Sequence, residues 1–206
     1  MLDYGCGFGD LTAALSADHE VVGVDVDSGR VGFARAQHPR LRFEVCRPDG
    51  LDFPDKSFDV VLSAVVVHFT PDPAGYLKEA RRVLRDEGTL VVLFRNKSIV
   101  RNAFRRWLGK PPVTPVTWGS RPLALFDWRE AEQLVRDAGF EVVESGAFND
   151  PLLSERHWKN VPISLVERLL TSIGSPSFAA YFGFLARTRD GLRGAGPVAE
   201  AEGGGR

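Results

Sequence analysis

Short apolar runs rich in β-branched residues alternate along the chain with segments whose apolar residues recur at helical spacing. The first run ends just before Gly5, and the other predicted strands are 20–26, 41–45, 58–65, 88–94, 140–143 and 178–187. This alternation predicts an α/β fold with a mostly parallel sheet. The run 58–65 suits a central strand buried on both faces, and 178–187 is expected to be a final strand paired at the sheet edge.

Capping residues indicate where the intervening helices begin and end. A short polar side chain before a helix accepts hydrogen bonds from its first free amides, and a glycine often ends a helix in a left-handed turn. The predicted capping residues are Asp10 for the first helix, Asp27 or Ser28 for the second, and Asp127 with Glu130 for a later helix that Gly139 ends.

Two longer segments interrupt the alternation. Residues 96–125 hold a basic helix-like stretch and a proline-rich loop, and residues 148–177 hold an amphipathic helix. Connections this long in a compact domain are usually functional or disordered, and their large apolar residues favour the first. We therefore predict one domain over 1–190 with these segments as cap insertions, and a disordered tail over 191–206.

Composition narrows the class of protein. The 206 residues include 44% hydrophobic residues and carry a net charge of -1, which suits one globular domain with no overall attraction to nucleic acid or anionic membranes. The two cysteines lack metal-ligand spacing, so we expect no metal site and a reducing, cytoplasmic compartment. No apolar stretch is long enough for stable membrane insertion.

The first strand leads into a loop in which Gly5, Gly7 and Gly9 alternate with other residues. A dinucleotide loop has the form GxGxxG, and here Asp10 occupies the place of its last glycine. Asp3, just before the loop, would repel a pyrophosphate but suits the ammonium of an amino acid. The loop therefore favours S-adenosylmethionine over a dinucleotide, and disfavours a nicotinamide-dependent oxidoreductase.

An acidic residue closes the second predicted strand. Asp25 is placed to accept hydrogen bonds from both hydroxyls of a ribose, and Val26 would then lie against the adenine edge. The alternative is that the glycines only make a tight turn and Asp25 is a surface residue.

Four stretches carry a family resemblance: LDYGCGFG, VVGVDVD, LDFPDKSFDVVLSAVVVHF and YLKEARRVLRDEGTLVVL. From Leu2 to Phe94 the chain resembles class I S-adenosylmethionine-dependent methyltransferases of the small-molecule group, which includes the ubiquinone-biosynthesis-like, type 11 enzymes. The resemblance implies a Rossmann-like seven-stranded sheet with an antiparallel last strand and helices on both faces. The cofactor-binding residues it implies are Asp3, Gly5, Gly7, Gly9, Asp25, Val26, Asp49, Gly50 and Val65.

The sequence departs from the family pattern in several places. Arg47 and Pro48 replace an aspartate–alanine pair, Val67 replaces a glutamate, and 86–88 replaces a proline–glycine–glycine turn, which we expect to be only a loop change. The helices that usually precede the first strand and cover the cofactor are absent from this sequence. These departures motivate the alternative of an impaired or truncated cofactor-binding remnant with no turnover.

Candidate groups for the reaction lie after the fourth strand and in the cap. His68 and His157 are candidate catalytic residues, with a structural role as the alternative for each. The basic segment 97–110 either meets an anionic substrate or lipid, or is a solvated helix face. Four aromatic residues either line an apolar substrate pocket or seal the cap onto the domain: Trp107, Trp118, Phe126 and Trp158.

The residues after the fourth strand also restrict the acceptor. Enzymes that methylate flipped bases carry an Asn/Asp-Pro-Pro-aromatic run there, and this chain has AVVVHF over 64–69. We therefore expect methyl transfer to the oxygen, nitrogen or carbon of a small, partly apolar metabolite, with no nucleic-acid partner.

Overall fold

The computed structural model describes residues 1–97, 107, 109, 117–118, 121–122, 124–148 and 181–188. Several predictions fall outside the described residues: they concern the tail 191–206, His157 and nearly all of the cap segment 148–177. The same is true of most of the basic segment 97–110.

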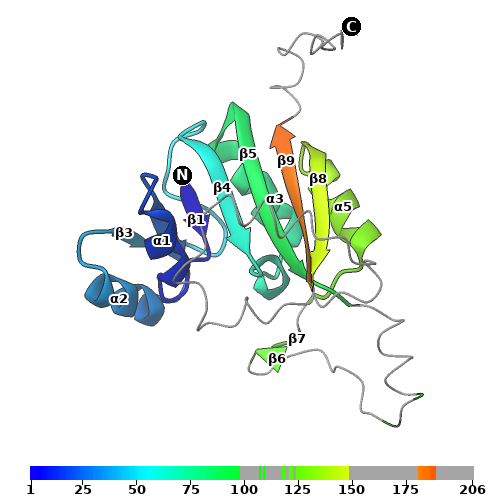
Figure 1. Ribbon diagram of the computed structural model, residues 1–206, viewed down its shortest axis with the longest axis horizontal. Helices are drawn as coiled ribbons and strands as arrows, with labels where there is room; N and C mark the ends of the chain where they lie inside the picture. The colour runs from blue at the N-terminus through cyan, green and yellow to red at the C-terminus, as the bar shows by residue number, and fades with distance from the viewer. Residues whose placement is uncertain are drawn as a thin grey trace, which may run out of the picture.

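Seven strands form one sheet (Figure 1). Their bounds are β1 (Leu2–Tyr4), β2 (Val22–Asp25), β3 (Arg42–Val45), β4 (Phe58–Ala64), β5 (Leu84–Arg95), β8 (Phe140–Phe148) and β9 (Tyr181–Thr188). The spatial order is β3-β2-β1-β4-β5-β9-β8, and every pairing is parallel except the two made by β9. The predicted mostly parallel sheet with an antiparallel last strand is therefore confirmed.

The expected edge position of the last strand is wrong. β9 lies between β5 and β8, and β8 is the edge strand (Figure 1). The fully buried side chains of Phe182 and Phe184 agree with an interior strand. The aromatic character of 178–187 indicated a strand but not its neighbours, because pairing is decided by contacts far away in the sequence.

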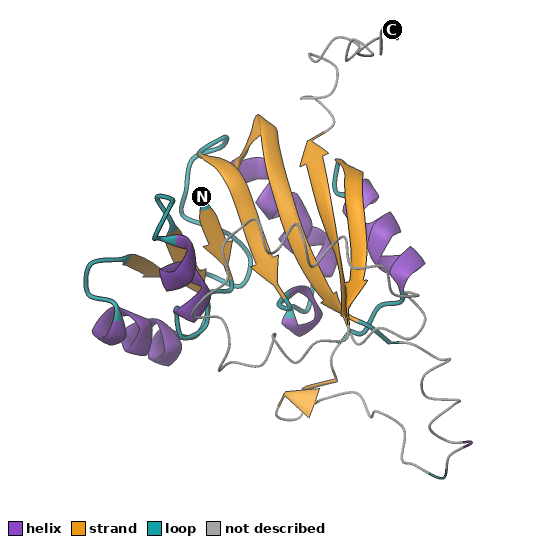
Figure 2. Cartoon of the chain, viewed as in Figure 1, coloured by secondary structure: helices purple, strands orange, loops and turns teal. Residues whose placement is uncertain are grey.

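Helices cover both faces of the sheet (Figure 2). Leu11 and Leu15 of α1 (Asp10–Leu15) pack with Leu62, whereas Val61 packs in the main core with α3 (Pro73–Val83) and α5 (Trp128–Asp137). Successive residues of a strand point to opposite faces, so α1 lies opposite α3 and α5. On the α1 face, α2 (Ser28–Gln37) packs through Ala34 near Phe43.

The capping predictions hold at two helices and fail at one. Asp27 caps α2 by accepting hydrogen bonds from the amides of Gly29 and Arg30. Asp127 and Glu130 form a complete capping box on α5, and Gly139 beyond it has φ +94°. Asp10 does not cap α1, because Gly9 with φ +86° is the cap and Asp10 is already helical.

Two connections also differ from expectation. Residues 86–88 lie within β5 and not in a loop, at an irregularity where the pairing passes from Phe58 with Leu84 to Val60 with Thr89. In the first cap segment, β6 (Thr117–Trp118) and β7 (Arg121–Pro122) pair as a short antiparallel ladder. Within the described part of the chain, no helix has the length and apolar character needed to cross a membrane.

Candidate functional site

The carboxyl ends of β1, β2 and β4 meet at one edge of the sheet. Parallel neighbours end on the same side, and the chain order reverses between β1 and β4, which is where open α/β sheets bind ligands. Gly5, Asp25 and Val65 stand at or just beyond these three strand ends. The sheet topology therefore brings three of the predicted cofactor residues to the same edge.

The loop after β1 turns through three glycines in the left-handed region, with φ of +92° at Gly5, +55° at Gly7 and +86° at Gly9. Only glycine adopts this region without a steric cost. The amides of Gly5 and Cys6 both donate to the carbonyl of Val24, each at 2.8 Å, which holds the start of the loop against β2.

The three glycines differ in what surrounds them. A Cβ on Gly5 would lie 2.4 Å from a methyl of Val66, and a Cβ on Gly9 would lie 2.8 Å from the ring of Phe43. A Cβ on Gly7 would meet nothing within 4 Å. Gly5 and Gly9 are thus required by packing, whereas Gly7 faces open space over which a ligand can approach the backbone.

The carboxylate of Asp25 is buried at the end of β2 and joins the loop to the next turn. One oxygen accepts the amide of Gly7 at 3.0 Å and the other accepts the amide of Asp27 at 2.9 Å. A carboxylate offers about four acceptor positions, so both oxygens retain capacity for further donors such as ribose hydroxyls. Asp25 is not a free surface residue, and the predicted alternative for it is wrong.

Asp3 lies within β1, where its carboxylate is buried and accepts a 2.6 Å hydrogen bond from the hydroxyl of Thr12. Burial raises the pKa of Asp3 to about 6, the bond from Thr12 opposes this, and the nearby Asp25 adds to it. A cation placed beside this carboxyl would favour its ionised form. Thr12 was not among the predicted residues, because a hydroxyl in the first turn of a helix does not by itself indicate which side chain it contacts.

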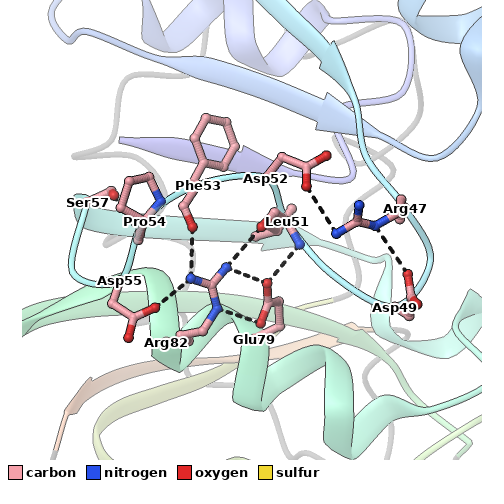
Figure 3. Close-up of polar contacts among 10 residues, drawn as sticks. All are labelled: Arg47, Asp49, Leu51, Asp52, Phe53, Pro54, Asp55, Ser57, Glu79 and Arg82. Carbon is pink, nitrogen blue, oxygen red and sulfur yellow. Dashed lines mark hydrogen bonds and ion pairs between the residues drawn. The ribbon is translucent and has the colours of Figure 1, made fainter.

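The loop after β3 holds two more predicted residues, Asp49 and Gly50, and Figure 3 shows the first of them. Arg47 pairs with Asp49 at 3.7 Å and with Asp52 at 3.0 Å, and it forms an isolated bridge with Gly50. The side chain of Asp49 is 86% exposed. The arginine that departs from the family pattern therefore makes an ion pair with Asp49, one of the cofactor-binding residues that the resemblance implies.

Two residues of α3 hold this loop in place (Figure 3). Arg82 donates to both carboxylate oxygens of Glu79, to the carbonyls of Leu51 and Phe53, and to Asp55, over 2.7–3.0 Å. Glu79 also accepts the amide of Leu51 at 2.7 Å. The hydrogen bonds from Arg82 lower the pKa of Glu79. In sequence these residues read as an ordinary i,i+3 pair, so their loop partners could not be identified.

The exit from β4 is conformationally strained and contains a buried histidine. Val65 has φ +61°, which costs a β-branched residue roughly 1–3 kcal/mol. His68 is 2% exposed, and burial, with the charge of Arg95, lowers its pKa to about 4. Among the described residues, its Nδ1 has no hydrogen-bond partner. His68 is therefore neutral at pH 7 with one ring nitrogen available.

Other predicted residues fall in different surroundings. Val26 is 56% exposed beside Asp25, and Phe8 of the glycine loop contacts Phe33 edge to face at 5.4 Å. Phe126 packs edge to face on buried Phe94 at 5.5 Å, which supports sealing of the cap onto the domain at this position. Trp107 is 78% exposed. The side chains of Trp118 and Trp158 lie outside the described part of the structure.

Comparisons with known proteins give a consistent result. A family model described as a methyltransferase domain matches residues 2–92. A probable S-adenosylmethionine-dependent methyltransferase of Mycobacterium tuberculosis is 33% identical over 164 residues, covering 75% of this chain and 54% of that protein. The chain thus spans about half the length of this curated relative.

Two further proteins extend the comparison. The 2-methyl-6-phytyl-1,4-hydroquinone methyltransferase of a Synechocystis species is 37% identical over 97 residues, which is 45% of this chain and 30% of that enzyme. A solved S-adenosylmethionine-dependent methyltransferase structure from Methanosarcina mazei has a TM-score of 0.65 at 22% identity and covers 91% of each chain. The matched stretch contains β1 to β4 with the glycine loop and Asp25. The sequence match assigns residues 2–92 to the methyltransferase-domain family, and the fold is that of solved S-adenosylmethionine-dependent methyltransferases.

Proposed function

We propose that this chain binds S-adenosylmethionine at the carboxyl ends of β1, β2 and β4 and transfers its methyl group to a small, partly apolar metabolite. The observation that carries the proposal is the 3.0 Å hydrogen bond from Gly7 to Asp25. It places the backbone of Gly7, which carries no Cβ and faces open space, beside a carboxylate with unused acceptor positions. S-adenosylmethionine fits this arrangement, because its ribose needs hydrogen-bond acceptors and its methionine part must pass close to the backbone.

Each predicted cofactor residue has a place in this proposal. Asp3 lies toward the amino-acid end, where an ammonium would compensate its buried charge. Asp25 holds the ribose, and the glycines permit close approach. The remaining residues flank the nucleoside from three loops: Val26 after β2, Asp49 and Gly50 after β3, and Val65 after β4.

The cofactor supplies an electrophilic methyl group on a sulfonium. The residues of the chain align the acceptor with that group and exclude water, and positioning of this kind contributes roughly 7–11 kcal/mol. A histidine with a pKa of about 4 is a weak general base near pH 7. We therefore assign His68 an orienting role, in which its unpartnered Nδ1 hydrogen-bonds the acceptor and does not take its proton.

Two observations support a small, partly apolar acceptor. The hydroquinone enzyme that matches the core is named for a substrate with an apolar chain, and residues 64–69 lack the run used for flipped bases. The acceptor atom is an oxygen, nitrogen or carbon in this proposal.

The two cysteines are free and buried, which favours a cytoplasmic location.

Calorimetric titration with S-adenosylhomocysteine, with NADH as the comparison ligand, tests the binding step. We expect saturable binding of the first ligand and none of the second; binding of NADH alone would reject the proposal. Incubation with isotopically labelled S-adenosylmethionine and a cytosolic extract tests turnover. Binding without transfer of label to any small molecule would instead favour the cofactor-binding remnant.

A further inference from the structure

The polar contacts of Tyr76 lie at the point where β1 and β4 separate. The ladder between these strands pairs Leu2 with Val61 and Asp3 with Leu62. The carbonyl of Tyr4, one residue further along β1, instead accepts a buried hydrogen bond from the hydroxyl of Tyr76 at 2.8 Å. A side chain from α3 therefore satisfies the last strand carbonyl before the glycine loop.

The same hydroxyl also contacts β4. Its oxygen lies 3.0 Å from the hydroxyl of Ser63. Because a carbonyl can only accept, the single proton of Tyr76 points to Tyr4, and Ser63 must donate to Tyr76. The rings of Tyr4 and Tyr76 stack at 3.9 Å with 14° between their planes. Tyr76 thus links α3 to both strands that border the site.

Burial keeps the hydroxyl of Tyr76 neutral and makes the loss of its two hydrogen bonds costly. Tyr76 is buried, and desolvation raises its pKa well above the ordinary value for tyrosine. Removal of its hydroxyl would leave both the carbonyl of Tyr4 and the hydroxyl of Ser63 without this partner in the core. No replacement donor to the Tyr4 carbonyl follows from the described contacts.

The link acts on the residue where the loop starts. Tyr4 is covalently joined to Gly5, whose Cα faces the methyl groups of Val66, so the loop is held from the β4 side by two independent contacts. On the β2 side it is held by the carbonyl of Val24 and by Asp25. Resting on the function proposed above, we propose that Tyr76 is a positioning residue that fixes the glycine loop for cofactor binding.

The test compares Tyr76→Phe, which keeps the stacked ring and removes only the hydroxyl, with Val135→Ala. Val135 is fully buried in α5, which packs on β8 and β9 away from the loop. Two readouts are measured on the full chain: hydrogen–deuterium exchange of peptides covering residues 1–11, and the affinity for S-adenosylhomocysteine by calorimetry. Val135→Ala controls for a general loss of stability.

We expect Tyr76→Phe to speed exchange in residues 1–11 and to weaken binding by about five- to tenfold, the size of one lost buried hydrogen bond. Val135→Ala should change neither. Unchanged loop exchange in Tyr76→Phe, unchanged affinity, or equal effects in Val135→Ala would each overturn the positioning role. If the unmodified protein fails to bind S-adenosylhomocysteine, the proposed function falls, and exchange alone still decides whether Tyr76 fixes the loop.

Discussion

The amide of Gly7 donates a hydrogen bond to the carboxylate of Asp25, and the two atoms are 3.0 Å apart. This contact joins the most open point of the loop after β1 to the end of β2. A ligand lying over Gly7 is therefore within reach of Asp25 without any rearrangement of the backbone. In the function proposed above, these two residues act together in binding the nucleoside of the cofactor.

Replacement of Asp25 by alanine should weaken the affinity for S-adenosylhomocysteine by at least tenfold. Two charge-assisted hydrogen bonds to ribose hydroxyls are lost, each worth roughly 1.5–3 kcal/mol. Calorimetric titration measures the change. Asp27→Ala removes the same charge two residues along and a helix cap worth about 1 kcal/mol, so it should lower stability and leave affinity unchanged. Equal affinity of Asp25→Ala and the unmodified protein would contradict the ribose assignment.

Gly5→Ala should destabilise the fold by about 2–4 kcal/mol in chemical denaturation. The added methyl meets Val66 at 2.4 Å, and the left-handed backbone adds strain. The double variant with Val66→Ala should recover about 1–2 kcal/mol, because only the steric part is relieved. Gly7→Ala has open space and should cost only about 1 kcal/mol. Additive effects of the two changes at Gly5 and Val66 would show that this contact is not what requires glycine.

Local patterns made much of the fold and half of the site predictable. The glycine turn, the acid that ends β2, and the caps at Asp27 and Asp127 each depend on a few neighbouring residues, so the sequence displays them directly. The capping of α1 was missed because Gly9 itself begins the helix, and no side chain is needed there.

The remaining features depend on residues far apart in the chain. Tyr76 bonds to Tyr4 across 72 positions, and Arg82 bonds to Leu51 across 31. Neither partner carries a local signal, since a tyrosine or arginine on a helix has many possible neighbours. The interior place of β9 is unpredictable for the same reason, because a strand's pattern records its burial and not its partners.

Affinity for S-adenosylhomocysteine should rise as pH increases through about 6 and then level off. The ligand's ammonium favours ionised Asp3, whose pKa in the free protein is about 6, so below that pH binding must first remove a proton. Asp3→Asn should bind more weakly at pH 7.5 and lose this dependence. Calorimetry between pH 5 and 8 measures both effects, and an identical pH profile in the two proteins would exclude Asp3.

Protonation of Asp3 should also make the stability of the free protein depend on pH, and stability should fall with rising pH where affinity rises. The folded pKa of this carboxyl lies above the ordinary value of 3.8, so the folded state holds the proton more tightly than the unfolded state between about pH 4 and 6. The contribution of Asp3 to stability is therefore present below pH 4 and is lost as pH rises to 6. Relative to the unmodified protein, Asp3→Asn should therefore gain unfolding free energy as pH rises from about 4 to 6.

Arg82→Lys should loosen the loop 51–55 while the rest of the sheet stays intact. Lysine keeps the charge but cannot reproduce the planar set of donors that reaches Glu79, Asp55 and two carbonyls together. Because the arginine is about one third exposed, we expect a loss of only about 1–2 kcal/mol in unfolding free energy. Hydrogen–deuterium exchange should quicken in peptides covering 49–55 and not in those covering β5.

Arg85→Lys is the matched control for this change. Arg85 lies three residues further along and pairs only with exposed Asp59 among its described ion pairs, so its replacement should cost less than about 0.5 kcal/mol. If Arg82 acts through the loop, its variant should also weaken S-adenosylhomocysteine binding, because Asp49 and Gly50 are then less well fixed beside the nucleoside. A variant of Arg82 that loses stability but binds as tightly as Arg85→Lys would confine Arg82 to a structural role and separate the 47–55 loop from the cofactor site.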